Sequence, residues 1–263
     1  MPAPRGSRSI AFHKPSPIRG SVISHTRGKL GWRGRIALPI APAMPTDDPA
    51  QRLAEIHDQI ARSARIADRP KDSTTLIAVS KTQPSEAIVP LLDAGQRDFG
   101  ENRVQEAQSK WPALREAYPD VRLHLIGQLQ SNKAAEAIAM FDTIHTVDRP
   151  SLVSALVKAM DAGGRRPDCF IQVNIGDESQ KGGCAISDLP DLLVQARDLP
   201  VVGLMALPPA DIESAPYFAL LAKLARDHGL AQLSMGMSGD FETAVTIGAT
   251  HVRVGTALFG ARA

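Results

Sequence analysis

The sequence predicts an α/β protein, a single (β/α)8 TIM barrel with an extra N-terminal helix. Apolar, strand-like runs alternate with helical patterns over most of the chain, and eight such runs can be counted. Strands that alternate with helical patterns of about 10–15 residues favour right-handed βαβ units and a parallel sheet. The length of 263 residues suits one such barrel of about 250 residues. A doubly wound open sheet is the alternative, because the second strand is weak.

The extra helix is expected to begin at Pro49. Asp48 can cap this helix through its carboxylate, and a proline suits the first helical turn. Leu53, Ile56 and Ile60 then recur at spacings of three and four residues, which gives the helix one apolar face.

The remaining elements follow in strict alternation. Strands are expected at residues 75–80, 97–99, 122–126, 143–146, 169–175, 201–205, 232–235 and 251–254. Helices are expected between them, at residues 84–94, 103–117, 131–141, 150–162, 186–197, 215–228 and 240–247.

The first 45 residues differ from the rest in composition. They are rich in Arg, Pro, Gly and Ser, contain no acidic residue and show no strand or helix period. Three interpretations stay open: a disordered tail, a start codon assigned too early with Met44 as the true start, or a transit-type peptide. We expect residues 1–45 to be a disordered or spurious basic tail and residues 46–263 to form the barrel domain.

The charge balance excludes a basic body of the kind that binds nucleic acid. Setting aside the eight Arg and Lys residues before Asp47 leaves 22 basic against 28 acidic residues.

No apolar run approaches the roughly 18 residues of a membrane span. Cys169 and Cys184 are the only cysteines, too few for a disulfide framework or a tetrathiolate zinc site. We therefore expect a cytoplasmic protein in a reducing compartment.

Lys81 is the most informative single residue. It directly follows an apolar strand, at the end where a barrel gathers its functional groups. A lysine at such a point is often a solvated loop residue. An apolar wall around the amine would instead lower its pKa and favour attack on a carbonyl.

Small residues after the last two predicted strands favour phosphate binding. Gly236, Ser238 and Gly239 follow the seventh strand, and Gly255 and Thr256 follow the eighth. Barrels often bind phosphate with these two loops, where backbone N–H groups can approach an anion. Two ordinary turns are the alternative. An amine and a phosphate site in one barrel indicate pyridoxal 5′-phosphate (PLP) as the cofactor.

Three kinds of polar residue lie on or after the expected strands. Arg253 could face the pyridine nitrogen of PLP or form an ion pair with a barrel carboxylate. Asn102 and Asn174 could hydrogen-bond the cofactor or cap their own loops. His124 and His145 lie on strands without metal-site spacing, and we expect them to be satisfied core residues.

Several segments together resemble the pyridoxal phosphate homeostasis proteins, the YggS/PROSC family. The matching segments are AVSKT at 78–82, FGEN at 99–102, VQE at 104–106, HLIG at 124–127, LQSNK at 129–133, QVNI at 172–175, GLM at 203–205, SMGMS at 234–238 and VRVGTALFG at 252–260. The resemblance covers roughly residues 49–262, and the order and number of the segments make it specific. Arg103 departs from the pattern, because many relatives carry an aromatic residue there.

The resemblance implies a fold-type III PLP barrel related to the N-terminal domain of alanine racemase. It implies PLP as an internal aldimine on Lys81, a phosphate held by Ser238, Gly255 and Thr256, and Arg253 at the pyridine nitrogen. Family members bind PLP and act in vitamin B6 homeostasis, without an established catalytic activity.

The remaining cofactor contacts expected are Asn102, Asn174 and Met205, which lies in the matching GLM segment. Lys133 and Lys181 follow other strands and are candidates for a secondary aldimine.

Two other functions stay open at this stage. A PLP-dependent amino-acid racemase is the first, although two-base racemisation needs a second acid/base group. The only tyrosines, Tyr118 and Tyr217, are predicted away from the strand ends. A barrel enzyme acting on a phosphorylated sugar is the second. We expect weak or no catalysis, no metal, no nucleic acid or membrane partner, a monomer, and PLP-requiring apoenzymes as candidate partners.

Overall fold

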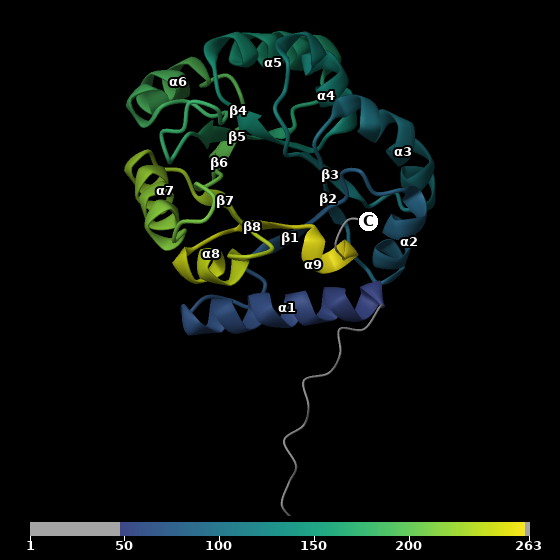
Figure 1. The fold of residues 1–263 in the computed structure, drawn as a ribbon. Helices are drawn as coiled ribbons and strands as arrows, with labels where there is room; N and C mark the ends of the chain where they lie inside the picture. The colour runs from purple at the N-terminus through teal and green to yellow at the C-terminus, as the bar shows by residue number, and fades with distance from the viewer. Residues whose placement is uncertain (1–47, 261–263) are drawn as a thin grey trace, which may run out of the picture. The chain divides into compact units, whose positions relative to one another are not determined.

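The computed structural model describes residues 48–260 and contains one closed barrel of eight parallel strands (Figure 1). The strands follow one another around the barrel in chain order, and β1 closes it by pairing with β8, with Ile77 opposite Arg253. They are β1 Thr75–Val79, β2 Asp98–Glu101, β3 Arg122–Leu125, β4 Thr143–Val147, β5 Asp168–Val173, β6 Val201–Ala206, β7 Gln232–Met237 and β8 His251–Val254. The predicted barrel is confirmed and the open sheet is excluded. The predictions for residues 1–45 lie outside the described residues.

The predicted strands are all present, and β2 and β7 each end two residues later than expected. β2 runs on through Gly100 and Glu101, and β7 runs on to Met237. Glycine and glutamate are depleted in β-strands. Gly100 is required here because a Cβ would lie 2.9 Å from Cγ2 of Ile77, and Glu101 is buried against polar partners. Tertiary packing therefore overrides the local preference.

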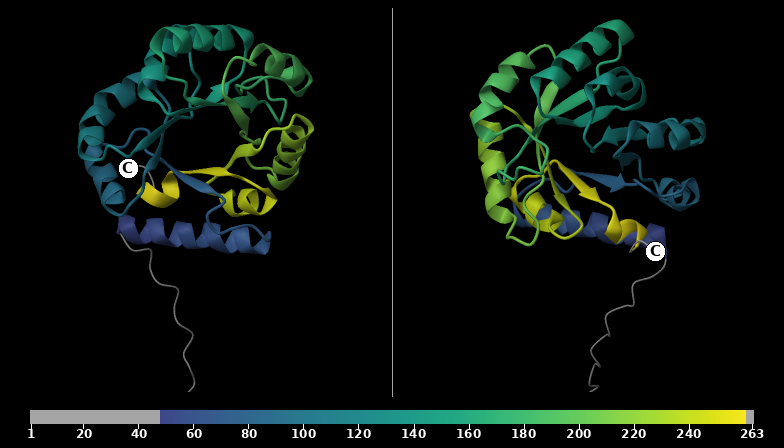
Figure 2. Two further views of the ribbon diagram at one scale, coloured as in Figure 1. Left: turned by 180° about the vertical axis from the view of Figure 1, so that it is seen from behind. Right: turned by 45° about the horizontal axis from the view of Figure 1, so that its top comes forward.

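The helices form a ring outside the barrel, as Figures 1 and 2 show. They are α1 Pro49–Ile66, α2 Ser85–Asp93, α3 Val104–Ala117, α4 Ala134–Met140, α5 Pro150–Gly163, α6 Leu189–Gln195, α7 Ala215–Asp227, α8 Phe241–Ile247 and α9 Thr256–Phe259. The expected helices at 131–141 and 186–197 each begin with a 3-10 turn, at Ser131–Lys133 and Ile186–Asp188.

The N-terminal helix α1 occupies the place of an eighth outer helix. It packs against α8, α2 and α9, beside the strands where the barrel closes (Figure 1). The helix that follows β8 is the four-residue α9, too short to cover this side. As predicted, Asp48 caps α1 through its side chain, and Leu53, Ile56 and Ile60 are buried. The N-terminal helix that the sequence predicts as an addition to the barrel therefore completes the ring of outer helices.

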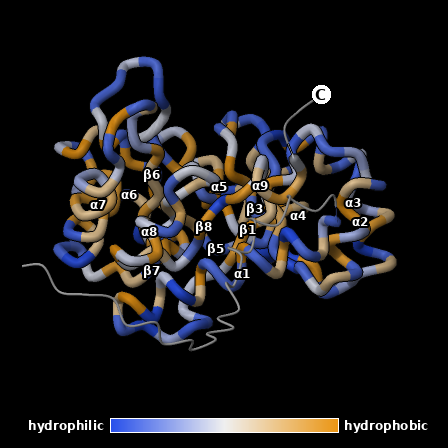
Figure 3. Tube along the Cα trace, turned by 60° about the horizontal axis from the view of Figure 1, so that its bottom comes forward, coloured by the Kyte–Doolittle hydropathy of each residue, from blue (hydrophilic) through white to orange (hydrophobic). Residues whose placement is uncertain are grey.

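The hydrophobic core lies mainly between the barrel and its helices. Figure 3 shows orange and blue alternating along the helices, which reflects one face turned to the strands. The barrel interior is more polar, since His124, His145, Gln172 and Ser234 are buried there. Among the described residues, no helix is long and apolar enough to cross a membrane.

Candidate functional site

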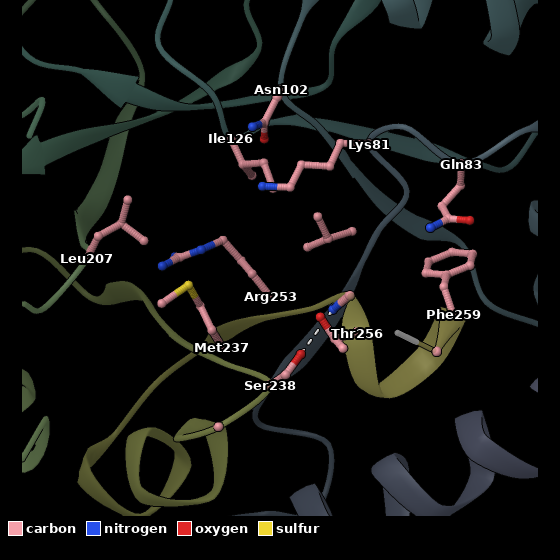
Figure 4. Close-up of a pocket in the computed structure, with 14 residues that line it drawn as sticks. Lys81, Gln83, Asn102, Ile126, Leu207, Met237, Ser238, Arg253, Thr256 and Phe259 are labelled. Carbon is pink, nitrogen blue, oxygen red and sulfur yellow. Dashed lines mark hydrogen bonds between the residues drawn. The ribbon is translucent and has the colours of Figure 1, made fainter. Parts of the chain in front are cut away.

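A pocket of about 360 Å³ opens at the carboxyl ends of the strands (Figure 4). Its lining comes from β1, β7, β8, α9 and the loops after β1, β2, β3, β6 and β7. The lining residues are Val79, Lys81, Gln83, Asn102, Ile126, Leu207, Met237, Ser238, Gly239, Arg253, Gly255, Thr256, Phe259 and Gly260.

Lys81 lies in a tight turn that begins where β1 ends. The N–H of Gln83 donates to the carbonyl of Ser80 at 3.0 Å, and Thr82 has a positive φ of 63°. A positive φ is unusual for a β-branched residue, so surrounding contacts must hold this turn. Figure 4 shows the Lys81 side chain extending into the pocket on the same side as Asn102.

The buried ammonium of Lys110 on α3 supplies these contacts. Its Nζ donates to the backbone carbonyls of Ser80 at 2.9 Å and Gln83 at 3.2 Å. The carboxylate of Glu106, one turn earlier on α3, accepts the N–H of Thr82. The first turns of α3 thus hold the peptide groups on both sides of Lys81.

Ser238 and Thr256 lie together across the pocket from Lys81 (Figure 4), and Gly255, directly before Thr256, also lines the pocket. Oγ of Ser238 accepts the N–H of Gly255 at 3.3 Å, which links the loop after β7 to the end of β8. Gly239 leaves open space, because a Cβ there would meet no atom within 4 Å. A hydroxyl pair and small residues at one end of a pocket suit an anionic group.

Arg253 reaches the pocket floor from inside β8 and is only 4% exposed. Its Nη1 donates to Oγ of Ser234 at 2.6 Å, and its Nη2 donates to the carbonyl of Ala206 at 3.0 Å. Burial lowers the pKa of Arg253 to about 10, so it remains a cation at neutral pH. Within the described residues its hydrogen-bond partners are neutral oxygens, and the ion-pair interpretation does not hold.

The structure brings together six of the eight residues predicted to bind the cofactor. These are Lys81, Asn102, Ser238, Arg253, Gly255 and Thr256. Asn174 and Met205 are placed elsewhere: the Asn174 amide bonds both backbone groups of Glu178 in its own loop, and Met205 is fully buried in β6.

The two lysines considered for a secondary aldimine lie outside the pocket lining. Lys133 pairs with Glu136, and Lys181 pairs with Glu178 and donates to the carbonyl of Pro208.

Sequence reasoning missed the apolar part of the lining, notably Ile126, Leu207 and Phe259. Ile126 and Leu207 each follow the last residue of a strand, so their positions at the carboxyl ends were an available signal. Phe259 sits on α9, a four-residue helix without enough sequence to show a period.

Comparison with known proteins adds to this geometry. The family described as "Alanine racemase, N-terminal domain" matches residues 52–263. The chain is 39% identical to the "Pyridoxal phosphate homeostasis protein" of Escherichia coli over 228 residues, which cover 82% of this chain and 97% of that protein. It is 41% identical to the protein of the same name from Pseudomonas aeruginosa over 221 residues, 81% of this chain and 95% of the relative.

This chain belongs to the pyridoxal phosphate homeostasis family. That identity spans nearly the whole length of these relatives and confirms the resemblance drawn from the sequence segments.

Solved structures support the family assignment. PipY of Synechococcus elongatus, solved with PLP bound, is 40% identical with a TM-score of 0.69, covering 81% of this chain and 100% of PipY. Alanine racemase of Clostridium difficile is only 14% identical, with a TM-score of 0.62 over 82% of this chain and 57% of the racemase. The racemase likeness shows the fold alone, whereas the likeness to PipY extends to the sequence, at 40% identity.

Proposed function

We propose that this protein binds PLP and serves in intracellular PLP (vitamin B6) homeostasis, with Lys81 as the covalent anchor. The main observation in support is that one pocket is lined by an amine, a buried guanidinium and a group of hydroxyls suited to an anion. The names of the relatives, and the PLP bound to PipY, support the same ligand.

The residues of the pocket fit the chemistry of PLP. Its volume of about 360 Å³ is at the small end of ligand pockets, as a single-ring cofactor requires. When bound, PLP supplies an aldehyde. The primary amine of Lys81 would be the nucleophile that holds this aldehyde covalently.

The opposite end of the pocket is suited to the phosphate. Ser238 and Thr256 offer hydroxyl groups, and Gly239 leaves room for an anion to approach the backbone. PLP carries its aldehyde and its phosphate arm on neighbouring ring carbons. One ring lying between Lys81 and these residues can therefore present the aldehyde to the amine and the phosphate to the hydroxyl groups.

Arg253 is suited to the pyridine nitrogen. A guanidinium carries only donors, so it favours an unprotonated ring nitrogen. An unprotonated nitrogen makes the ring a weaker electron sink, which suits a carrier better than a catalyst.

Catalysis by the racemase route lacks a second proton-transfer group in this pocket. Among the described lining residues there is no Tyr, His, Cys, Asp or Glu to face Lys81. Tyr118 ends α3 and Tyr217 lies on α7. Two-base racemisation requires an acid/base group on each face of the substrate. We therefore infer weak or absent catalysis, and purified protein loaded with PLP should not racemise L-alanine faster than free PLP does.

We further propose that residues 46–263 form one PLP-binding barrel domain of a cytoplasmic monomer, with PLP-requiring apoenzymes as recipients. Cys169 and Cys184 are unbridged and buried, which fits a reducing compartment. A single species at the monomer mass by light scattering would agree with the monomer; a stable dimer would contradict it.

The central experiment is borohydride reduction of the PLP-loaded protein followed by peptide mapping. The reduced pyridoxyl group should be found on Lys81, and Lys81→Ala should abolish the absorbance of the bound cofactor. Lys133→Ala and Lys181→Ala are matched controls that should keep it. Ser238→Ala should weaken PLP retention without moving the covalent link. Labelling at another lysine in the wild-type protein would contradict the proposal.

A further inference from the structure

A chain of hydrogen bonds crosses the inside of the barrel below the pocket. From Arg253, Oγ of Ser234 leads to Nδ1 of His145 at 2.8 Å, and Nε2 of His145 lies 3.0 Å from Nδ1 of His124. Nε2 of His124 lies 2.9 Å from Oδ1 of Asp98, at the amino end of β2. The chain therefore connects the pocket to the opposite mouth of the barrel.

The members of this chain are held rigidly. The rings of His124 and His145 and the hydroxyl of Ser234 are all fully buried. His145 also stacks on Phe170, with ring centroids 4.5 Å apart and planes 7° from parallel, which fixes its ring plane. Because a buried polar group is costly without a partner, each bond in the chain constrains the next.

The direction of each hydrogen bond follows from the two ends. Arg253 has only donors and the Asp98 carboxylate only acceptors. His145 is neutral, since burial holds its pKa well below the ordinary value. With both rings neutral, each imidazole has one donor and one acceptor, so Ser234 donates to His145, His145 donates to His124, and His124 donates to Asp98. Ser234 uses its only proton for His145, so its lone pairs are left to accept from Arg253.

We propose that His145 and His124 are positioning residues for bound PLP, acting through Ser234 and Arg253. They fix the Ser234 hydroxyl as an acceptor. The guanidinium of Arg253 is thereby held in an orientation suited to the pyridine nitrogen. The inference rests on the proposed PLP-binding function. The chain of hydrogen bonds then does more than fill the barrel core. Without His145, the Ser234 hydroxyl can rotate, and Arg253 loses a fixed hydrogen-bond partner.

The variant that tests this is His145→Met, which removes both the acceptor and the donor. Loss of one hydrogen bond that holds Arg253 should raise the Kd for PLP by about tenfold. It should also shift the absorbance band of bound PLP, because the contact at the ring nitrogen changes. His145→Gln keeps an acceptor and a donor on one side chain and should restore Kd to within about threefold of wild type.

His251→Met is the matched control. Its ring is half-buried and its centroid lies 5.9 Å from that of His145, but it bonds Thr250 and is not part of the hydrogen-bond chain. The control should lower the melting temperature as His145→Met does, yet leave the Kd within about threefold and the absorbance band in place.

A double-mutant cycle separates positioning from general damage. In an Arg253→Gln background, His145→Met should not weaken PLP binding further, because the chain acts through the guanidinium. If His145→Met does not fold, Ser234→Ala breaks the chain with a smaller change and should give the same rise in Kd.

The inference is overturned if the chain-breaking variant binds PLP as wild type does, or if His251→Met weakens binding equally. These outcomes differ from failure of the proposed function, in which wild-type protein would carry no PLP on Lys81 in the borohydride mapping.

Discussion

Nζ of Lys110 lies 2.7 Å from Oε1 of Glu101, and both side chains are buried, at 7% and 0% exposure. The same carboxylate oxygen accepts from Oγ of Ser80 at 2.7 Å and from Nε1 of Trp111 at 2.9 Å. Lys110 in turn donates to the carbonyl of Ser80, directly before the proposed anchor Lys81. A buried ion pair thus stabilises the turn that carries Lys81.

Lys110→Met should therefore destabilise the fold. Removing one partner leaves the Glu101 carboxylate buried with only neutral donors, which costs about 3 kcal/mol. Urea unfolding should show a lower midpoint with the slope unchanged. Because the turn at Lys81 loses two hydrogen bonds, the variant should also release PLP faster.

Two further variants control this prediction. Lys223→Met removes an exposed lysine from a surface pair on α7 and should leave the urea midpoint close to that of wild type. Combining Lys110→Met with Glu101→Gln should recover part of the lost stability, since no uncompensated charge is then buried. Equal midpoints for Lys110→Met and Lys223→Met would refute the role of the pair.

Gly236→Ala should destabilise the protein through its backbone. Gly236 has a φ of 92°, and a Cβ there would lie 2.5 Å from Cβ of Ala244 on α8. Left-handed strain and the clash together should cost on the order of 2 kcal/mol. Gly239→Ala is the control, because a Cβ at that position meets no atom within 4 Å. Similar melting temperatures for the two variants would show that the close packing on α8 is not required.

Stability should fall in mild acid because the folded protein lowers the pKa of two histidines, His145 and His251. Burial, the largest cause, lowers the pKa of His251 to about 3 and that of His145 well below 6.5. Below about pH 6.5 the unfolded chain binds protons that these folded side chains do not. Their contribution is complete above that pH and decreases toward pH 3. The slope should approach about 1.4 kcal/mol per pH unit for each histidine.

His251→Gln tests the sign of this dependence. Between pH 6 and pH 5, the variant should lose stability less steeply than wild type, because one of the groups that binds a proton only on unfolding is gone. Urea midpoints at several pH values give both slopes, and equal slopes would contradict the assignment.

The two cysteines should react slowly with thiol reagents in the folded protein. Burial raises the pKa of both Cys169 and Cys184 to about 12, and the thiolate is the reactive form. Titration with an aromatic disulfide at pH 8 should modify both thiols in urea and neither promptly in buffer. Rapid native labelling of Cys169 would mean that the barrel opens around β5.

Much of the site could be predicted because its chemistry is local in the sequence. Lys81, Ser238 and Gly255 each stand within two residues of the end of a strand, and parallel strands of a barrel end at one mouth. The alternation of strand and helix therefore sufficed to place them together. The same pattern predicted every strand of the barrel, with errors only at the ends of elements.

Other features depended on contacts between residues far apart in the chain. The sequence alone left open whether Asn174 contacts the cofactor or caps its loop, and its bonds to Glu178 favour the cap. From the sequence alone, His124 and His145 are expected to be two separate core residues. Their strands lie side by side, and the two rings meet inside the barrel. Strand periodicity sets which side chains point inward, whereas barrel closure and side-chain packing decide which of those inward groups touch.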